Sequence, residues 1–259
     1  MENPLHGYWD NSGLLLGDTV LVHSSMKRVF RYLITNGYEA NPALVIDSLS
    51  DAIGPEGTIL FPLFNFDFPT CQYFSMISTP SQMGTVTEYA RLNYEGSRTG
   101  HPIYSFYVLG HNAKEFLGID NKSGYGSDSP FAKVIELNGK IASVDLDDQN
   151  SMTMYHYVEE SMKVDYRYFK DFNGTYEDLS GVKSEKTYCL YVRNIERGVV
   201  TDVNRMGEIL WKENLYQGNR PRMANGMRTI LAKKFYERTA QEIEAGRALE
   251  TLYSINKIK

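Results

Sequence analysis

The chain reads Thr19-Val20-Leu21-Val22-His23-Ser24-Ser25 near its start, a short apolar run that ends in small polar residues. Such a run predicts a buried strand followed by a loop. A second run, Thr58-Ile59-Leu60-Phe61-Pro62, predicts another strand that extends into the aromatic segment 63–68. Between them, residues 43–53 have the apolar spacing of a helix, which Gly54-Pro55-Glu56-Gly57 ends. Strand, helix and strand in this order form a βαβ unit, so we expect a parallel strand pair and an α/β fold.

Further periodic segments follow along the chain. They predict helices at 81–94, 113–117, 129–137, 202–211 and 232–253, strands at 105–110, 140–144 and 188–193, and a strand with a turn at 223–231. No internal repeat or linker separates these segments. We therefore expect one α/β domain over residues 1–259, with a central, mostly parallel mixed sheet flanked by helices.

Charge and composition exclude several classes of protein. The net charge is −5, whereas a nucleic-acid-binding protein normally presents a basic face. Cys71 and Cys189 lie far apart and have neither metal-site nor redox spacing. The sequence shows no signal-peptide pattern and no apolar run of about 20 residues. We expect a cytoplasmic protein without a membrane span that acts on small molecules, and the sequence leaves homo-oligomerisation open.

The segment from Thr153 to Glu160 places an imidazole and two carboxylates within one predicted helical turn. Residues three and four apart share a helix face, so Glu159 and Glu160 can both lie near His156. A carboxylate beside a histidine fixes its tautomer and holds its pKa near neutrality, as a general base requires. An exposed helix with ordinary surface charges explains the same pattern, so this segment alone does not decide the function.

Three loops carry further residues of functional type. His23-Ser24-Ser25 follows a predicted strand, at the edge where open α/β sheets bind ligands. Arg98-Thr99-Gly100-His101-Pro102, followed by Ser105, contains an arginine suited to a phosphate or a carboxylate. Tyr125-Gly126-Ser127-Asp128-Ser129-Pro130-Phe131 leads into a predicted helix, whose free amides suit an anion or an oxyanion. A strand end, a tied turn and a helix cap are the structural alternatives for the three loops.

An acidic loop, 145–148, precedes the His156 segment. Its aspartates suit an ammonium substrate, although most acidic loops are solvated turns. The sequence contains no metalloprotease, hydrolase-elbow, phosphate-loop or dinucleotide-binding motif. Its five histidines are dispersed, so we expect no metal site.

Taken in order, six short segments resemble the aminoglycoside 3-N-acetyltransferase (antibiotic N-acetyltransferase) family, which is distinct from the GNAT superfamily. The matching pieces are Gly17-Asp18 through His23-Ser24-Ser25, Gly54-Pro55-Glu56-Gly57-Thr58 through Pro62, Met83-Gly84, Arg98-Thr99-Gly100-His101-Pro102 with Ser105, Ser129-Pro130-Phe131, and Thr153 with His156 and Glu159. They cover residues 17–160, and residues 164–259 are less similar to the family. The segment from Tyr166 to Lys170 looks like the subgroup found beside bacterial surface-polysaccharide genes.

The resemblance implies an α/β acetyltransferase with acetyl-CoA as donor and a sugar-borne amine as acceptor. It implies that His156 is the catalytic base, supported by Glu159, with Thr153 in the same site. It also implies that the loop His23-Ser24-Ser25 contacts CoA. Further candidates for the CoA site are Arg98, His101, Ser105, Ser129 and Phe131. Candidate substrate carboxylates are Asp67, Asp145, Asp147, Asp148 and Glu160.

The sequence therefore predicts an acetyl-CoA-dependent N-acetyltransferase that acylates an amino sugar, either nucleotide-linked or a glycan precursor, in polysaccharide biosynthesis. The alternatives are an aminoglycoside antibiotic 3-N-acetyltransferase and a non-catalytic sugar- or CoA-binding protein on the same scaffold. One departure bears on the acceptor pocket. The family usually has a glycine-containing strand end before the catalytic segment, where this chain has Val144-Asp145-Leu146-Asp147.

Overall fold

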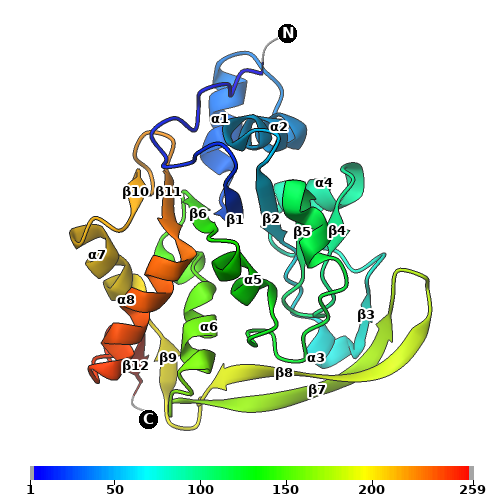
Figure 1. Cartoon of the computed structure of the whole chain (residues 1–259), viewed down its shortest axis with the longest axis vertical. Helices are drawn as coiled ribbons and strands as arrows, with labels where there is room; N and C mark the ends of the chain where they lie inside the picture. Colours follow the sequence, from blue (N-terminus) through cyan, green and yellow to red (C-terminus); the bar gives the residue numbers. More distant parts are fainter. Residues whose placement is uncertain (1–2, 257–259) are drawn as a thin grey trace.

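The computed structural model describes residues 3–256 and is built around a seven-stranded mixed sheet (Figure 1). In spatial order its strands are β10 (Gln217–Gly218), β11 (Met227–Leu231), β6 (Lys140–Val144), β1 (Thr19–Ser24), β2 (Thr58–Pro62), β5 (Phe106–Gly110) and β4 (Ser97–Arg98). β1 pairs in parallel with both β6 and β2, and the outer pairs are antiparallel. The expected α/β class is confirmed, with parallel pairing at the centre of the mixed sheet.

Helices cover both faces of this sheet. Side chains alternate along β1, so that Val20 and Val22 enter one hydrophobic core and Leu21 enters the other. The first core packs beneath α1 (Lys27–Thr35), α2 (Pro42–Ile53) and α4 (Thr85–Asn93). The second packs beneath α5 (Pro130–Glu136), α6 (Met154–Ser161), α7 (Asn204–Lys212) and α8 (Ala232–Glu244). Three layers therefore hold the central strands rigidly between two cores.

Local sequence explains where the first helices form. At α2, the Asn41 side chain accepts from the Ala43 amide at 2.9 Å, Pro42 occupies the first turn, and Gly54 follows the end with φ of 69°. The sequence analysis missed α1, which buries Val29 and Leu33 on one face. These residues are four apart, as on a helix, but basic residues surround them in a short segment.

A long antiparallel hairpin, β7 (Arg167–Glu177) and β8 (Lys183–Arg193), crosses the lower part of the molecule in Figure 1. At its far end β7 pairs in parallel with β3 (Tyr73–Ser75). Its near end lies beside α6 and β9 (Val199–Thr201), and β9 pairs with β12 (Tyr253–Ile255). The prediction of a strand at 188–193 found only the buried end of this hairpin.

Three predicted boundaries were wrong for local reasons. The strand at 58–62 does not extend through the aromatic run, because the Asn65 side chain accepts from the Asp67 amide at 3.0 Å and turns the chain into α3 (Phe68–Cys71). The helix expected from Ser81 begins at Thr85, because residues 81–84 form a turn that bonds back to the helix. α8 ends at Glu244, where Gly246 adopts φ of 70°.

The remaining predicted elements agree in type with short elements of the structure. The strand at 105–110 is β5, which is antiparallel to β2, and the helix at 113–117 is the 3-10 turn η1 (His111–Phe116). A second 3-10 turn, η2 (Asp148–Asn150), follows β6. The C-terminal part of the chain contributes β11, which pairs directly with β6 in the central sheet. Over residues 3–256, the structure has no helix with the length and apolar character needed to cross a bilayer.

Candidate active site

The carboxyl ends of three parallel strands meet at one edge of the sheet. His23-Ser24-Ser25 ends β1, the 63–66 loop follows β2, and the 145–148 loop follows β6. In open α/β sheets this edge is where ligands bind. α6 begins directly beyond the third loop and brings His156 to the same edge.

His156, Glu159 and Arg167 form one charged cluster at this edge. The Nδ1 atom of His156 lies 3.0 Å from Oε2 of Glu159, one helical turn away. The Nε atom of Arg167, at the start of β7, lies 2.8 Å from the same carboxylate oxygen without the alignment of a hydrogen bond, and an Nη atom lies 3.0 Å from His156 Nδ1. Arg167 is further tied by a 3.1 Å bond to the Tyr191 carbonyl. The cluster therefore fixes the imidazole from its Nδ1 side.

Burial and charge set the protonation of this cluster. Burial lowers the pKa of His156, and the charge of Arg167 lowers it further, while Glu159 partly offsets both. Burial alone would raise the pKa of Glu159, but the charge of Arg167 and the bond to His156 outweigh it and leave that pKa below its usual value. At neutral pH the site thus holds a neutral imidazole beside an ionised carboxylate, the state that a general base requires.

His156 lies between two cavities. The inner cavity, of about 330 Å³, is bordered by His23, Phe66, Met83, Thr153 and His156, with others. The hairpin cavity, of about 390 Å³, is bordered by His156 and by residues of β7 and β8. Tyr104, His156 and Thr201 border both cavities. The side chain of His156 is 22% exposed, whereas Glu159 is 1% exposed, so the imidazole faces the open space and the carboxylate lies behind it.

A third cavity, of about 280 Å³, lies along the loop after β1. Ser24, Ser25 and Lys27 line it on one side and Gly84 on the other, at the start of α4. Met83 borders both this cavity and the inner one. The loop predicted to contact CoA thus lines a cavity that adjoins, at Met83, the inner cavity of His156.

The structure brings together the three residues predicted to be catalytic. Thr153 immediately precedes α6, and its side chain makes no capping hydrogen bond there. It borders the inner cavity together with His156. His23 also borders this cavity, but burial and the Arg228 charge lower its pKa to about 3, so it stays neutral.

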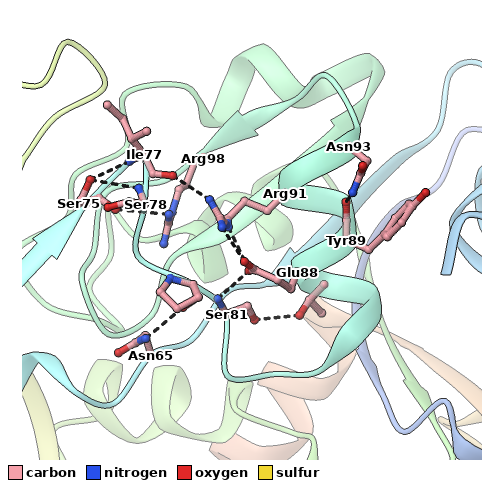
Figure 2. Close-up of polar contacts among 12 residues, drawn as sticks. Asn65, Ser75, Ile77, Ser78, Ser81, Glu88, Tyr89, Arg91, Asn93 and Arg98 are labelled. Carbon is pink, nitrogen blue, oxygen red and sulfur yellow. Dashed lines mark hydrogen bonds and ion pairs between the residues drawn. The ribbon is translucent and has the colours of Figure 1, made fainter.

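Arg98 lies apart from these cavities. It is buried, and its guanidinium donates to the carbonyls of Ser75 and Met76 at 3.4 and 3.0 Å and lies 4.9 Å from the Phe74 ring centre. Figure 2 shows Arg98 directed at the turn of residues 75–78. Burial lowers the pKa of Arg98 to about 10, which still leaves it charged at neutral pH. Arg98 therefore holds this turn against the sheet, contrary to the expected role at a phosphate.

The other proposed CoA contacts are also packed inside the protein. His101, Ser105, Ser129 and Phe131 are buried, and none of these four lines a cavity that contains His156. The Nδ1 atom of His101 accepts from the Tyr104 amide at 3.0 Å, which fixes the turn that carries Tyr104 to the cavities. These buried residues support the loops that line the site and do not themselves line its cavities. The α5 start at Ser129 is likewise not positioned to stabilise an oxyanion at His156.

The acidic candidates are separated from one another. Asp145, with φ of 58°, turns away to form a 2.8 Å ion pair with Arg28, and Asp147 caps η2. Asp148 is buried and bonded to Arg228, Tyr155 and Tyr216. It borders the inner cavity, but its oxygens are taken by these bonds. Glu160 accepts from Ser123 at 2.7 Å, and exposed Asp67 borders neither cavity of His156. Among the described residues the acidic candidates therefore form no patch for an ammonium substrate, because each is bound to a different partner or lies apart.

Arg167 and Tyr104 were not predicted as site residues, and Tyr125 was noted only as part of the loop 125–131. The rings of Tyr104 and Tyr125 lie 4.8 Å apart, and that of Tyr125 lies 5.2 Å from His156. No local spacing connects these residues to residue 156. The abundance of tyrosine did indicate a ring-lined pocket, but only the packing of the hairpin against α6 shows which rings form it.

Solved structures with the same fold define the class of protein. The chain superposes on aminoglycoside acetyltransferase AAC(3)-Xa with a TM-score of 0.74 and 21% identity, over 90% of this chain and 88% of that one. It superposes on AAC-IIIb in a binary complex with CoASH with a TM-score of 0.74 and 18% identity, over 93% and 94%. For YokD from Bacillus subtilis the TM-score is 0.71 with 21% identity, over 89% and 94%. The fold is that of the aminoglycoside acetyltransferases.

Sequence comparison identifies the family. The family model for aminoglycoside 3-N-acetyltransferase matches residues 21–227, and the chain belongs to this family. A curated relative, the SPbeta prophage-derived aminoglycoside N(3')-acetyltransferase-like protein YokD of Bacillus subtilis (strain 168), is 25% identical over 170 residues. The alignment covers 57% of this chain and 60% of the relative, which is less than two thirds of the relative's length. The family match extends beyond the segments at 17–160 that carry the resemblance.

Proposed function

We propose that this protein transfers an acetyl group from acetyl-CoA to the amine of an amino sugar, with His156 as the general base. The observation that carries the proposal is the position of His156, whose imidazole borders two neighbouring cavities while Glu159 and Arg167 hold its far side. Two substrates that enter from opposite sides would meet at this ring. Family membership supports the reaction class.

The donor fits the cavities on the β1 side. One relative, AAC-IIIb, has been solved with CoASH and another, AAC-VIa, with sisomicin. In this chain Ser24, Ser25 and Lys27 line the outer part of the β1-side space, at the start of α1. Hydroxyls, an ammonium and free helix amides suit the phosphates of CoA. The thioester would then reach His156 through the inner cavity.

The chemical step follows from this placement. The neutral amine attacks the thioester carbonyl carbon, and His156 takes the proton that the nitrogen must lose. The carbon–sulfur bond then breaks, an amide remains on the sugar, and the CoA thiolate takes the proton back from the imidazolium. The products are the N-acetyl sugar and CoASH, and His156 is again neutral. Glu159 stabilises the transient imidazolium, and Thr153 offers a free hydroxyl at the same cavity.

Thiol release from acetyl-CoA, measured with and without pooled amino sugars, tests the proposal. We expect acceptor-dependent release in the wild type and a loss of about 10²- to 10⁴-fold in His156→Ala, which is the usual value of general-base help. Calorimetry should show that this variant still binds CoA. His111→Ala is the matched control, because His111 is an exposed histidine outside both cavities of His156. Acceptor-independent release would instead indicate a thioesterase, and CoA binding without release would indicate a binding protein.

A further inference from the structure

One face of the β7–β8 hairpin forms a wall of the hairpin cavity. Tyr168, Lys170 and Phe172 alternate along β7, and Val192 and Leu190 lie opposite the first two on β8. Alternate residues of a strand, and residues directly opposed across an antiparallel pair, share a face. All five line the cavity. The hairpin thus presents one continuous surface that leads toward His156.

The charge around this cavity is positive. Arg167, Lys170 and Arg193 line it, and among the described residues its lining includes no aspartate or glutamate. Arg167 is paired with Glu159. Lys170 and Arg193 are exposed, and no carboxylate within residues 3–256 forms an ion pair with either. Two cations without a protein counter-ion beside a cavity favour an anionic ligand.

The same cavity is rich in aromatic rings. Those that line it are Tyr104, Tyr125, Tyr168, Phe172 and Tyr191. Tyr104 and Tyr125 lie near His156, and Phe172 lies along the hairpin, 5.6 Å from the Lys170 ammonium. Aromatic side chains stack on planar bases at about 1–3 kcal/mol for each base. Rings interleaved with free cations therefore suit a ligand that has both a base and phosphates.

On the basis of the proposed function, we propose that the acceptor is an amino sugar linked to a nucleoside diphosphate. Its diphosphate lies in the cavity that Lys170 and Arg193 line, its base packs on the hairpin rings, and its amine reaches His156. An aminoglycoside would place several ammonium groups beside those two cations, with no carboxylate in the lining to receive them. Like charges brought together in this way oppose binding.

Kinetics with matched acceptors test this assignment. Thiol release is measured with UDP- and dTDP-linked amino sugars, with the same sugars free, and with sisomicin. We expect a nucleotide-linked sugar to exceed its free sugar in kcat/KM by about 100-fold. Lys170→Gln and Arg193→Gln should each raise the acceptor KM by about 10- to 100-fold, as expected for the loss of a hydrogen bond to a charged group. The KM for acetyl-CoA should stay unchanged.

Lys183→Gln is the control, because it removes the same charge from the same hairpin outside the cavity. It should alter neither KM. Preferred turnover of sisomicin or of the free sugar, still dependent on His156, would overturn the acceptor class and leave the proposed function standing. A rise in the KM for acetyl-CoA alone would also overturn it, because the donor would then occupy the hairpin cavity. Release that is independent of His156 would refute the proposed function itself.

Binding of nucleoside diphosphates that carry no amino sugar tests the acceptor class without the choice of one particular sugar. Calorimetry with UDP, dTDP, CDP, GDP and ADP on the His156→Ala variant should reveal at least one ligand. Adding Lys170→Gln and Arg193→Gln to that variant should weaken its affinity by about 10-fold or more. Failure of all five to bind, or equal affinity in both proteins, would overturn the inference.

Discussion

Two neighbours of His156 compete for the same ring nitrogen. Glu159 Oε2 and an Nη atom of Arg167 both lie 3.0 Å from Nδ1, and one can only accept while the other can only donate. If Nδ1 had no proton, its lone pair would face an ionised carboxylate. With the proton on Nδ1, Glu159 accepts it and the same Nη atom can still donate to Thr201 at 3.3 Å. This tautomer leaves the Nε2 lone pair free, as a general base requires.

The two neighbours should shift the pKa of His156 in opposite directions. Burial and Arg167 lower that pKa, and Glu159 raises it. We therefore expect Glu159→Gln to lower the pKa of His156 further and Arg167→Gln to raise it. NMR titration of the His156 ring measures this pKa directly. A pH–rate profile would mix it with the pKa of the acceptor amine, which also titrates. The sign follows from charge alone, so shifts in the same direction would contradict the proposed arrangement of the cluster.

The Glu159→Gln variant should lose activity as well as change the pKa of His156. Glu159→Gln removes the charge that stabilises the imidazolium, so kcat/KM should fall by at least about 10-fold, although by less than in His156→Ala. The sequence did predict this pair, because their spacing is that of one helix face. Arg167 escaped prediction, because it belongs to a different element and approaches only through the fold.

Elements with strong local signals were predictable, and those defined by packing were not. The βαβ unit was predicted from apolar runs, a proline and glycines that act within a few residues. The first part of β7 after Arg167 and the first part of β8 are largely exposed, so they lack the apolar alternation of a covered strand. The partner strand β3 lies almost 100 residues earlier in the sequence, and no periodic pattern links the hairpin to α6, the element just before it. The hairpin cavity could therefore not be predicted from the sequence.

A buried ion pair ties β11 to the loop before α6. Arg228 lies 2.9 Å from Asp148, with side chains 0% and 5% exposed. Arg228→Met would leave Asp148 buried without its counter-ion, which costs about 3–5 kcal/mol. Chemical denaturation should record that loss at neutral pH. Burial already raises the pKa of Asp148, and Arg228 opposes this rise, so the deficit should shrink in acid as the carboxyl group protonates.

The surface offers a matched pair for comparison. Arg205 and Glu250 are also 2.9 Å apart, but their side chains are 64% and 70% exposed. Arg205→Met should cost less than about 1 kcal/mol, because solvent screens such pairs. Equal costs at the two sites would mean that Arg228 acts through something other than a desolvated charge.

Across the whole molecule, the sequence predicted the position of the site better than it predicted the charged side chains that surround the site. Strand ends and the His156 helix were found because a parallel sheet brings its carboxyl ends to one edge. The expected acidic pocket failed to form because a loop side chain can turn to either side of that edge. Asp145 turns to Arg28 and Asp148 into the core, while the hairpin supplies Lys170 and Arg193 instead. Charge at a site is thus a property of the assembled fold.

Two buried histidines make the stability of the whole fold depend on pH. Burial lowers the pKa of His101 to about 3. Burial and the charge of Arg228 lower the pKa of His23 to about 3 as well. In the unfolded chain both titrate near their ordinary value of about 6.5. Between these values the unfolded chain binds a proton at each site that the folded protein does not. The free energy of unfolding should therefore fall with falling pH, by about 1.4 kcal/mol per pH unit for each histidine.

His101→Asn isolates one of the two contributions. The asparagine oxygen can replace Nδ1 as the acceptor for the Tyr104 amide but does not titrate. Denaturation between pH 7 and pH 5 should show a less stable variant whose slope is shallower by about 1 kcal/mol per pH unit on average, because the unfolded histidine is only partly protonated near pH 7. Ser105→Ala, at another buried position that does not titrate, should keep the wild-type slope whatever stability it loses. An unchanged slope in His101→Asn would mean that His101 binds protons equally in the folded and unfolded chains, so that burial does not lower its pKa.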